Sequence, residues 1–237
     1  VGAPGIVLAL CYLWVRDPAQ APAQAATVSF WSALKSAFTL FRKPIVLWAC
    51  VGGALQLFVL LSLYSWLPSF IHRSYDLPAD QAGVYAASII LLGAVGSVAW
   101  GYAVGRWGRG DFGRRLRVVA LGGALCGAFL VAGFGLAPLG PWQWACLAIG
   151  RFCATCSIGA VPAVMMETAP SGIRATALAL VAMAQNLFGQ ALGPFSTGVL
   201  SDTLGLGLAL GVASTAALLA SAAFVWAGVA QAATRVS

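Results

Sequence analysis

The sequence predicts an all-α membrane protein with six full transmembrane helices, preceded by the end of another helix. Of its 237 residues, 61% are hydrophobic and only 8% are charged, too few to solvate a soluble surface. Apolar runs of about 20 residues recur along the chain, and each is long enough to cross roughly 30 Å of hydrocarbon. Backbone N–H and C=O groups in lipid must be satisfied within the segment, so we expect these runs to be helical.

The apolar runs give the expected organisation in order. The six full segments are residues 45–71, 84–104, 117–137, 143–165, 177–199 and 207–230. The run at 1–15 is too short to span a bilayer and is interpreted as the end of a preceding helix, with more sequence expected upstream. Residues 16–44 form a linker and residues 231–237 a tail. The linker contains an aromatic face with basic flanks, which favours an amphipathic helix at the membrane surface over a solvated linker; its residues are Phe30, Trp31, Leu34, Phe38 and Phe41.

The basic residues predict the orientation. Of the thirteen Lys and Arg residues, Arg73 alone falls in a loop on one side and Arg151 lies inside a segment. The other eleven gather in loops on the opposite side and in the tail, which are therefore expected in the cytoplasm. We expect a multi-pass protein of a cell membrane, the bacterial inner membrane, with linker and C-terminus cytoplasmic. The net charge of +7 then reflects topology and not binding to nucleic acid.

Ionisable groups are too few for most enzyme chemistry. The chain has one His and six carboxylates, and its six cysteines lie almost entirely inside apolar segments. The CxxC pair Cys153 and Cys156 lies in mid-membrane, away from the accessible helix N-terminus that a redox pair needs, so packing explains it better. We therefore expect no catalytic residue, no metal site and no cofactor.

Polar side chains inside the apolar segments indicate a cavity. Arg151 lies deep in the fourth segment, where a charge costs at least a few kcal/mol unless it meets water, a carboxylate or a carbonyl. It either contacts an anionic substrate or hydrogen-bonds to a neighbouring helix. The other cavity candidates are the polar residues of the first and fifth segments: Gln56, Tyr64, Gln185, Asn186 and Gln190. Amides also serve as plain interhelical hydrogen bonds, and that alternative stays open.

Three groups of residues form motifs along the chain, and the third group below precedes the other two in sequence. The first is Gly101, Arg106, Gly108, Arg109, Arg114 and Arg115. The second is Arg151, Gly159, Glu167, Pro170, Arg174, Asn186, Gly189, Gly193, Pro194, Gly198 and Asp202. The third is Tyr64, Trp66, Leu67, Pro68, Phe70 and Arg73, with Gln81, Ala82 and Gly83 after a short loop. Together they resemble the major facilitator superfamily of transporters, with its Spinster-like subgroup nearest. The family has an acidic residue where this chain has Gly105.

The resemblance implies that the six segments are helices 7 to 12 of a major facilitator fold, that 1–15 ends helix 6, and that 16–44 links the two halves. It implies a secondary active transporter of a small organic or lipid-like solute. Transport would proceed by alternating access between this half and a missing N-terminal half, with proton coupling through a carboxylate upstream. The implied partners are that half, the lipid bilayer and the small-molecule substrate.

The resemblance also implies a gate. Its cytoplasmic residues are Arg106, Arg109, Glu167 and Arg174, while Asp202 caps an outer helix end. Gly193 and Pro194 allow the fifth segment to pack closely and to bend. A seven-helix membrane receptor or sensor is the alternative, because a partial helix plus six gives that count.

Overall fold

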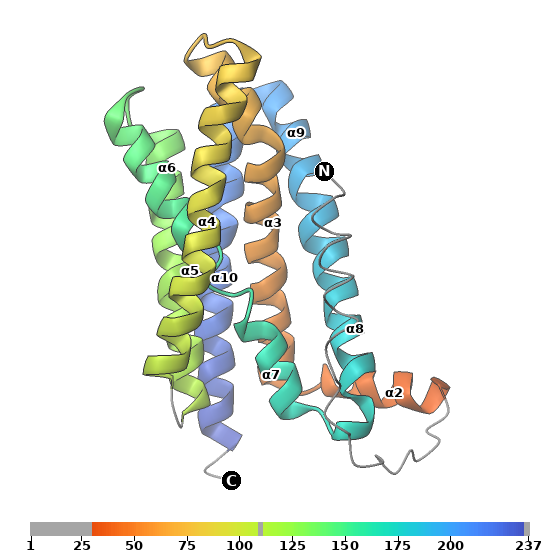
Figure 1. The fold of residues 1–237 in the computed structure, drawn as a ribbon. Helices are drawn as coiled ribbons and strands as arrows, with labels where there is room; N and C mark the ends of the chain where they lie inside the picture. The colour runs from red at the N-terminus through yellow and green to blue at the C-terminus, as the bar shows by residue number, and fades with distance from the viewer. Residues whose placement is uncertain (1–29, 109–110, 235–237) are drawn as a thin grey trace, which may run out of the picture.

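The computed structural model of the chain describes residues 30–108 and 111–234, and every regular element in these two ranges is a helix. The long helices stand side by side in one bundle, and α2 (Phe30–Leu40) lies across one end of it (Figure 1). The predicted all-α membrane architecture is confirmed. The predicted helix end at 1–15, the first part of the predicted linker, Arg109 and the last residues of the tail lie outside the described residues.

Five helical runs in the described ranges are long and apolar enough to cross a membrane. They are α3 (Pro44–Ser74), α4 (Ala79–Trp107), α5 (Phe112–Gly135), the combined run Ser171–Leu204, and Leu206–Gln231 within α10 (Leu206–Thr234). The combined run joins the 3₁₀ turn η1 (Ser171–Ile173), α8 (Arg174–Gln185), the π-helix η2 (Asn186–Ala191) and α9 (Leu192–Leu204). These runs correspond to five of the six predicted segments.

Helix ends follow local sequence signals. α3 begins at Pro44, whose missing N–H would have no partner in the first turn of any helix. Asp111 precedes α5 and caps it, because its carboxylate accepts a hydrogen bond from the Gly113 N–H at 3.0 Å. α9 is followed by Gly205, which has a φ of 79°, a left-handed conformation that favours glycine.

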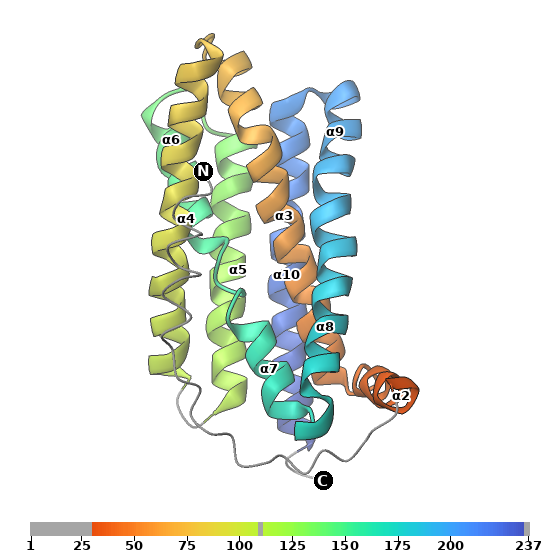
Figure 2. The ribbon, with the colours of Figure 1, turned by 45° about the vertical axis from the view of Figure 1, so that its right-hand side comes forward.

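Helices α3, α5 and α10 pack together, with α10 behind the other two in Figure 2. Glycines allow this close approach. A methyl group added at Gly52 of α3 would come within 2.8 Å of the Phe224 ring, and one at Gly127 of α5 within 2.6 Å of Leu218. Lipid tails are as apolar as leucine, so close van der Waals packing of this kind stabilises helix association in a membrane.

The fourth predicted segment, 143–165, is not one helix, and the prediction was wrong on this point. It is divided into α6 (Pro141–Cys153) and α7 (Ala160–Thr168) by turns at 154–159. Pro162 gives the physical reason, since it has no N–H to donate to the carbonyl of Ile158 and its ring clashes there with a continuing helix. In the first turn of α7 the same proline is tolerated.

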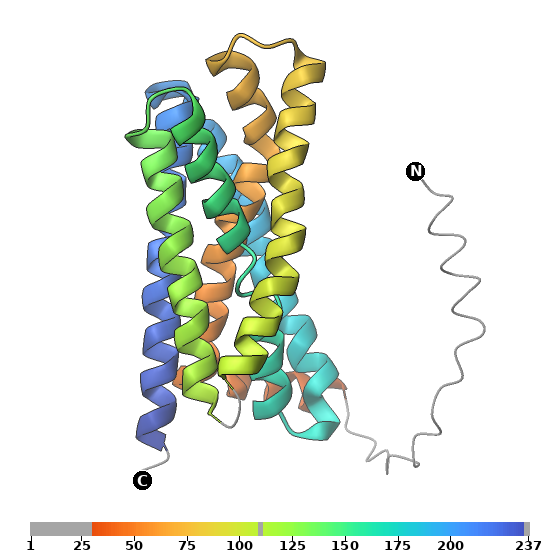
Figure 3. The same ribbon diagram turned by 60° about the vertical axis from the view of Figure 1, so that its left-hand side comes forward.

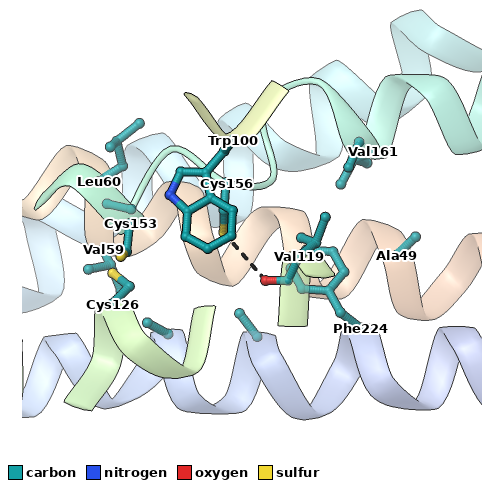
Figure 4. Packing of buried hydrophobic residues seen from close by; sticks show 14 of the residues in the cluster. Ala49, Val59, Leu60, Trp100, Val119, Cys126, Cys153, Cys156, Val161 and Phe224 are labelled. Carbon is teal, nitrogen blue, oxygen red and sulfur yellow. Dashed lines mark hydrogen bonds between the residues drawn. The ribbon is translucent and has the colours of Figure 1, made fainter. Parts of the chain in front are cut away.

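The backbone of this break is held by other parts of the bundle. The Gln56 side chain of α3 donates a hydrogen bond from Nε2 to the carbonyl of Ala154 at 3.1 Å. The Cys156 thiol donates to the carbonyl of Val119 on α5 at 3.5 Å, beneath the Trp100 ring (Figure 4). Residues 154–157 are buried. Irregular backbone at membrane depth is tolerated where protein buries it in this way.

The run from α8 to α9 bends around a proline. The π-helix η2 ends three residues before Pro194, which cannot donate a backbone hydrogen bond. On α3, the Trp66 indole N–H donates to the carbonyl of Pro194 at 2.9 Å. A methyl group added at Gly193 would lie 2.5 Å from the carbonyl oxygen of Phe58. The predicted close packing of this segment is therefore packing against the α3 backbone.

We expect Gly193→Ala to destabilise the protein, because the added methyl meets the rigid backbone of α3. Overpacking of this kind costs about 1–3 kcal/mol. The measurement is thermal unfolding in detergent micelles. Gly83→Ala is the matched control, since nothing lies within 4 Å of a methyl group there and alanine is the better helix former. Equal melting temperatures for the two variants would contradict the packing described above.

Replacing Gln56 by Leu should loosen the break between α6 and α7. The carbonyl of Ala154 loses its partner, and a hydrogen bond contributes about 0.5–1.5 kcal/mol net. Amide hydrogen exchange over 154–159 is therefore expected to accelerate about 2- to 10-fold. Gln81→Leu, at an exposed position on the first turns of α4, provides the control and should leave those amides unchanged.

Candidate functional site

Arg151 lies in the last turn of α6, directly before the break. Its side chain is only 1% exposed, although arginine is rarely buried without a partner. The guanidinium carbon lies 4.7 Å from the centre of the Tyr64 ring on α3, within cation–π range. Gly93 of α4 provides the space, because a methyl group there would lie 2.6 Å from that carbon. Three helices thus enclose one charged group.

Several buried donors and acceptors in this region have no hydrogen-bond partner among the described residues. Arg151 has no acceptor for its Nε and Nη1 donors, and Gln56 has no donor for its Oε1. A buried polar group without a partner costs about 1–3 kcal/mol. Unpaired donors around a cation fit an anionic group or ordered water.

Two cavities flank the break. The smaller, about 130 Å³, lies between α3, α8 and the break, and Gln56 and Gln185 both line it. The larger, about 480 Å³, lies between α4, α5 and α7, and its lining is mostly apolar apart from Arg115. Figure 2 shows α7 between α5 and α8. The break therefore adjoins space on both sides.

The structure brings together some of the predicted cavity residues and separates others. Gln56 and Gln185 share the small cavity, while Tyr64, 42% exposed, covers Arg151. Asn186 and Gln190 are exposed on η2, and their side chains make no hydrogen bond within the described part of the chain. A role in substrate contact stays a prediction for all six residues.

Of the predicted cytoplasmic gate residues, the three that the structure describes lie at the end of the bundle that carries α2: Arg106, Glu167 and Arg174. There Glu167, at the end of α7, forms an ion pair with Arg115 of α5, and the Nε of Arg115 also donates to the carbonyl of Gly108 at 3.1 Å. Arg174 donates instead to the carbonyl of Ala169 at 3.0 Å. Arg106 is exposed and has no polar contact among the residues described.

Sequence analysis did not name Arg115 as a partner of Glu167. It named Arg106 and Arg109 from the loop motif, whereas the arginine that reaches Glu167 is Arg115, further along the same motif. The spacing of α4 and α5 decides which arginine faces α7, and the motif alone does not give it. At the opposite end, Asp202 is exposed in the last turn of α9, without a polar contact in the described ranges. Its capping role stays a prediction.

Comparison with known proteins gives one family and one fold. Residues 1–194 match the Major Facilitator Superfamily. Two solved structures share the fold, both of a bacterial homologue of the human lysosomal transporter Spinster. The inward-facing, unoccupied form is 20% identical, with a TM-score of 0.72 over 97% of this chain and 57% of that one. The inward-facing, occupied form is 22% identical, with a TM-score of 0.59 over 100% of this chain and 56% of that one. Among curated proteins, none matches the sequence.

The chain thus spans little more than half the length of these solved structures. The family match extends from the first residue into α9 and includes the break, Arg151 and the Arg115–Glu167 ion pair. The resemblance stated from the ordered motifs is confirmed: the chain belongs to the major facilitator superfamily.

Proposed function

We propose that this chain forms the C-terminal half of a secondary active transporter for a small organic or lipid-like anion. Transport proceeds by alternating access, with the substrate held between this half and an N-terminal half. The buried guanidinium of Arg151, with two donors unpaired, carries the proposal. Membership of a transporter superfamily favours this function over a seven-helix receptor.

A purely structural role for Arg151 accounts less well for its contacts. The adjacent break leaves backbone carbonyls outside a regular helix, and an arginine that only stabilised the break would bond to them. Instead Gln56 bonds to Ala154, while the Nε and Nη1 of Arg151 have no acceptor in the residues described. A carboxylate, phosphate or sulfonate accepts charge-assisted hydrogen bonds from guanidinium donors of this kind.

Proton coupling, the second part of the proposal, depends on a carboxylate outside the described helices. The described acidic residues all lie at helix ends or in loops: Asp76, Asp80, Asp111, Glu167 and Asp202. None is at the depth of Arg151. A proton carrier in the pathway is therefore assigned to the N-terminal half.

The gate, in this proposal, is the contact between α5 and α7. Arg115 and Glu167 hold the end of α7 beside α5, and the break at 154–159 lies at its other end. This end of the bundle carries most of the described basic residues, so we assign it to the cytoplasm of a cell membrane. Opening of the contact would let α7 move relative to α6.

We expect Arg151→Gln to weaken binding of an anionic amphiphile by the complete transporter. The probe is dodecyl phosphate, with dodecyltrimethylammonium as the charge-reversed control, and the measurement is the ligand-induced shift in melting temperature. Loss of a charged hydrogen-bonding partner costs about 1.5–3 kcal/mol, a 10- to 100-fold loss of affinity. Arg73→Gln, at the exposed opposite end, should bind as the wild type does. Unchanged binding by Arg151→Gln would remove this residue from the site.

The ion pair of Arg115 and Glu167 should show a small, salt-sensitive coupling. Because both side chains are partly exposed, a double-mutant cycle with Arg115→Gln and Glu167→Gln is expected to give about 0.2–1 kcal/mol. Thermal unfolding at low and high salt measures it, and 1 M salt should remove most of it. Asp202→Asn combined with Arg115→Gln should be additive, and an equal coupling there would disprove a specific contact.

A further inference from the structure

A second cleft lies on α4, away from the candidate substrate site. It has a volume of about 460 Å³ and is lined by Trp100, Tyr102, Ala103, Arg106, Trp107 and Phe152. The larger cavity beside the break uses other residues of α4, namely Ser97, Gly101, Val104 and Gly105. Of the residues lining the two, Trp100 alone is shared, so its ring separates the cleft from the cavity.

The cleft exists because α6 stops halfway through the bundle. In Figure 3, α6 ends at mid-height between α4 and α5, and it contacts both helices. The chain then crosses at 154–159 to α7, which contacts α3, α5 and α8. The next two turns of a continuous helix would have filled the space beneath Phe152. Without them, a large apolar surface of α4 is left uncovered by the described residues.

The side chains of the cleft change character along α4. Trp100 and Phe152 form its apolar part, and the buried indole N–H of Trp100 has no acceptor in the described ranges. Towards the basic end follow Tyr102 and Trp107, which are 72% and 65% exposed. Tyrosine and tryptophan with such exposure are typical of the boundary between headgroups and hydrocarbon.

Arg106 lies at the same end of the cleft, and its charge is not compensated. Two neighbouring arginines of this end have carboxylate partners, Arg114 with Asp111 and Arg115 with Glu167. Arg106 has none among the described residues. It is six residues from Trp100, a distance of about 9 Å along the helix axis. The positively charged side chain of Arg106 therefore lies at the basic end of a cleft whose other part is apolar.

We propose that this cleft binds one anionic phospholipid from the leaflet at the basic end of the bundle. Its phosphate accepts hydrogen bonds from Arg106, and an acyl chain lies along Trp100 and Phe152. Cationic side chains attract anionic headgroups, and the apolar part of the cleft accommodates a chain that a free phosphate lacks. The proposal is independent of any substrate at Arg151.

The test is native mass spectrometry of the complete protein, titrated with phosphatidylglycerol or with phosphatidylcholine of the same acyl chains. We expect one tightly held phosphatidylglycerol. Arg106→Gln should lower its affinity about fivefold and remove the preference over phosphatidylcholine. Arg117→Gln, an exposed arginine on α5 outside the cleft, is the matched control and should change neither.

A second variant tests the binding of the acyl chain in the cleft. Ala103→Phe fills the cleft and should weaken both lipids equally, while thermal unfolding checks that the variant is folded. Glycerol phosphate, which has the headgroup chemistry and no chain, should not compete. Equal losses in Arg106→Gln and Arg117→Gln would reduce the effect to general surface charge and overturn the proposal. Competition by glycerol phosphate would also overturn the proposal. Absence of bound lipid would overturn it too, and is expected if another part of the complete protein pairs with Arg106.

Discussion

The rest of the described bundle depends on how the backbone of the break between α6 and α7 is hydrogen-bonded within the protein. The carbonyl of Ala154, in the break, accepts a hydrogen bond from the Gln56 side chain of α3. The Cys156 thiol, also in the break, donates one to the carbonyl of Val119 on α5. Each bond joins elements far apart in the sequence. The position of α7, the two cavities beside it and the cleft beneath α6 all follow from this arrangement. An unbroken helix would have filled that space.

The fold was largely predictable from composition and periodicity, because a membrane restricts the possible structures to a few. Long apolar runs can only be helices there, and five of the six proved to be so. The remaining segment, 143–165, is divided into two helices, because hydropathy does not detect the missing backbone N–H of Pro162. That residue was visible in the sequence, and a proline inside an apolar segment is a recognisable signal of a helix start.

The site was less predictable than the fold. A buried charge is conspicuous in an apolar segment, so Arg151 was found from sequence alone. Its surroundings were not, since Tyr64 and Gly93 reach it only through the crossing of α3, α4 and α6. The same holds for Arg115, which a motif places in a loop and only the tertiary structure places beside Glu167. Residue type shows which groups need partners, whereas helix packing decides which partners they meet.

The division into two half-helices also changes the electrostatics of the bundle's interior. α6 has 13 residues and α7 has 9, so a helix C-terminus and a helix N-terminus both lie within the protein instead of at its surfaces. Aligned peptide dipoles leave a partial negative charge at the first and a partial positive charge at the second. Arg151 lies in the last turn of α6, on the negative end. In a partly buried position such an end stabilises a cation by up to about 2 kcal/mol. The backbone thereby offsets part of the charge that no described carboxylate neutralises.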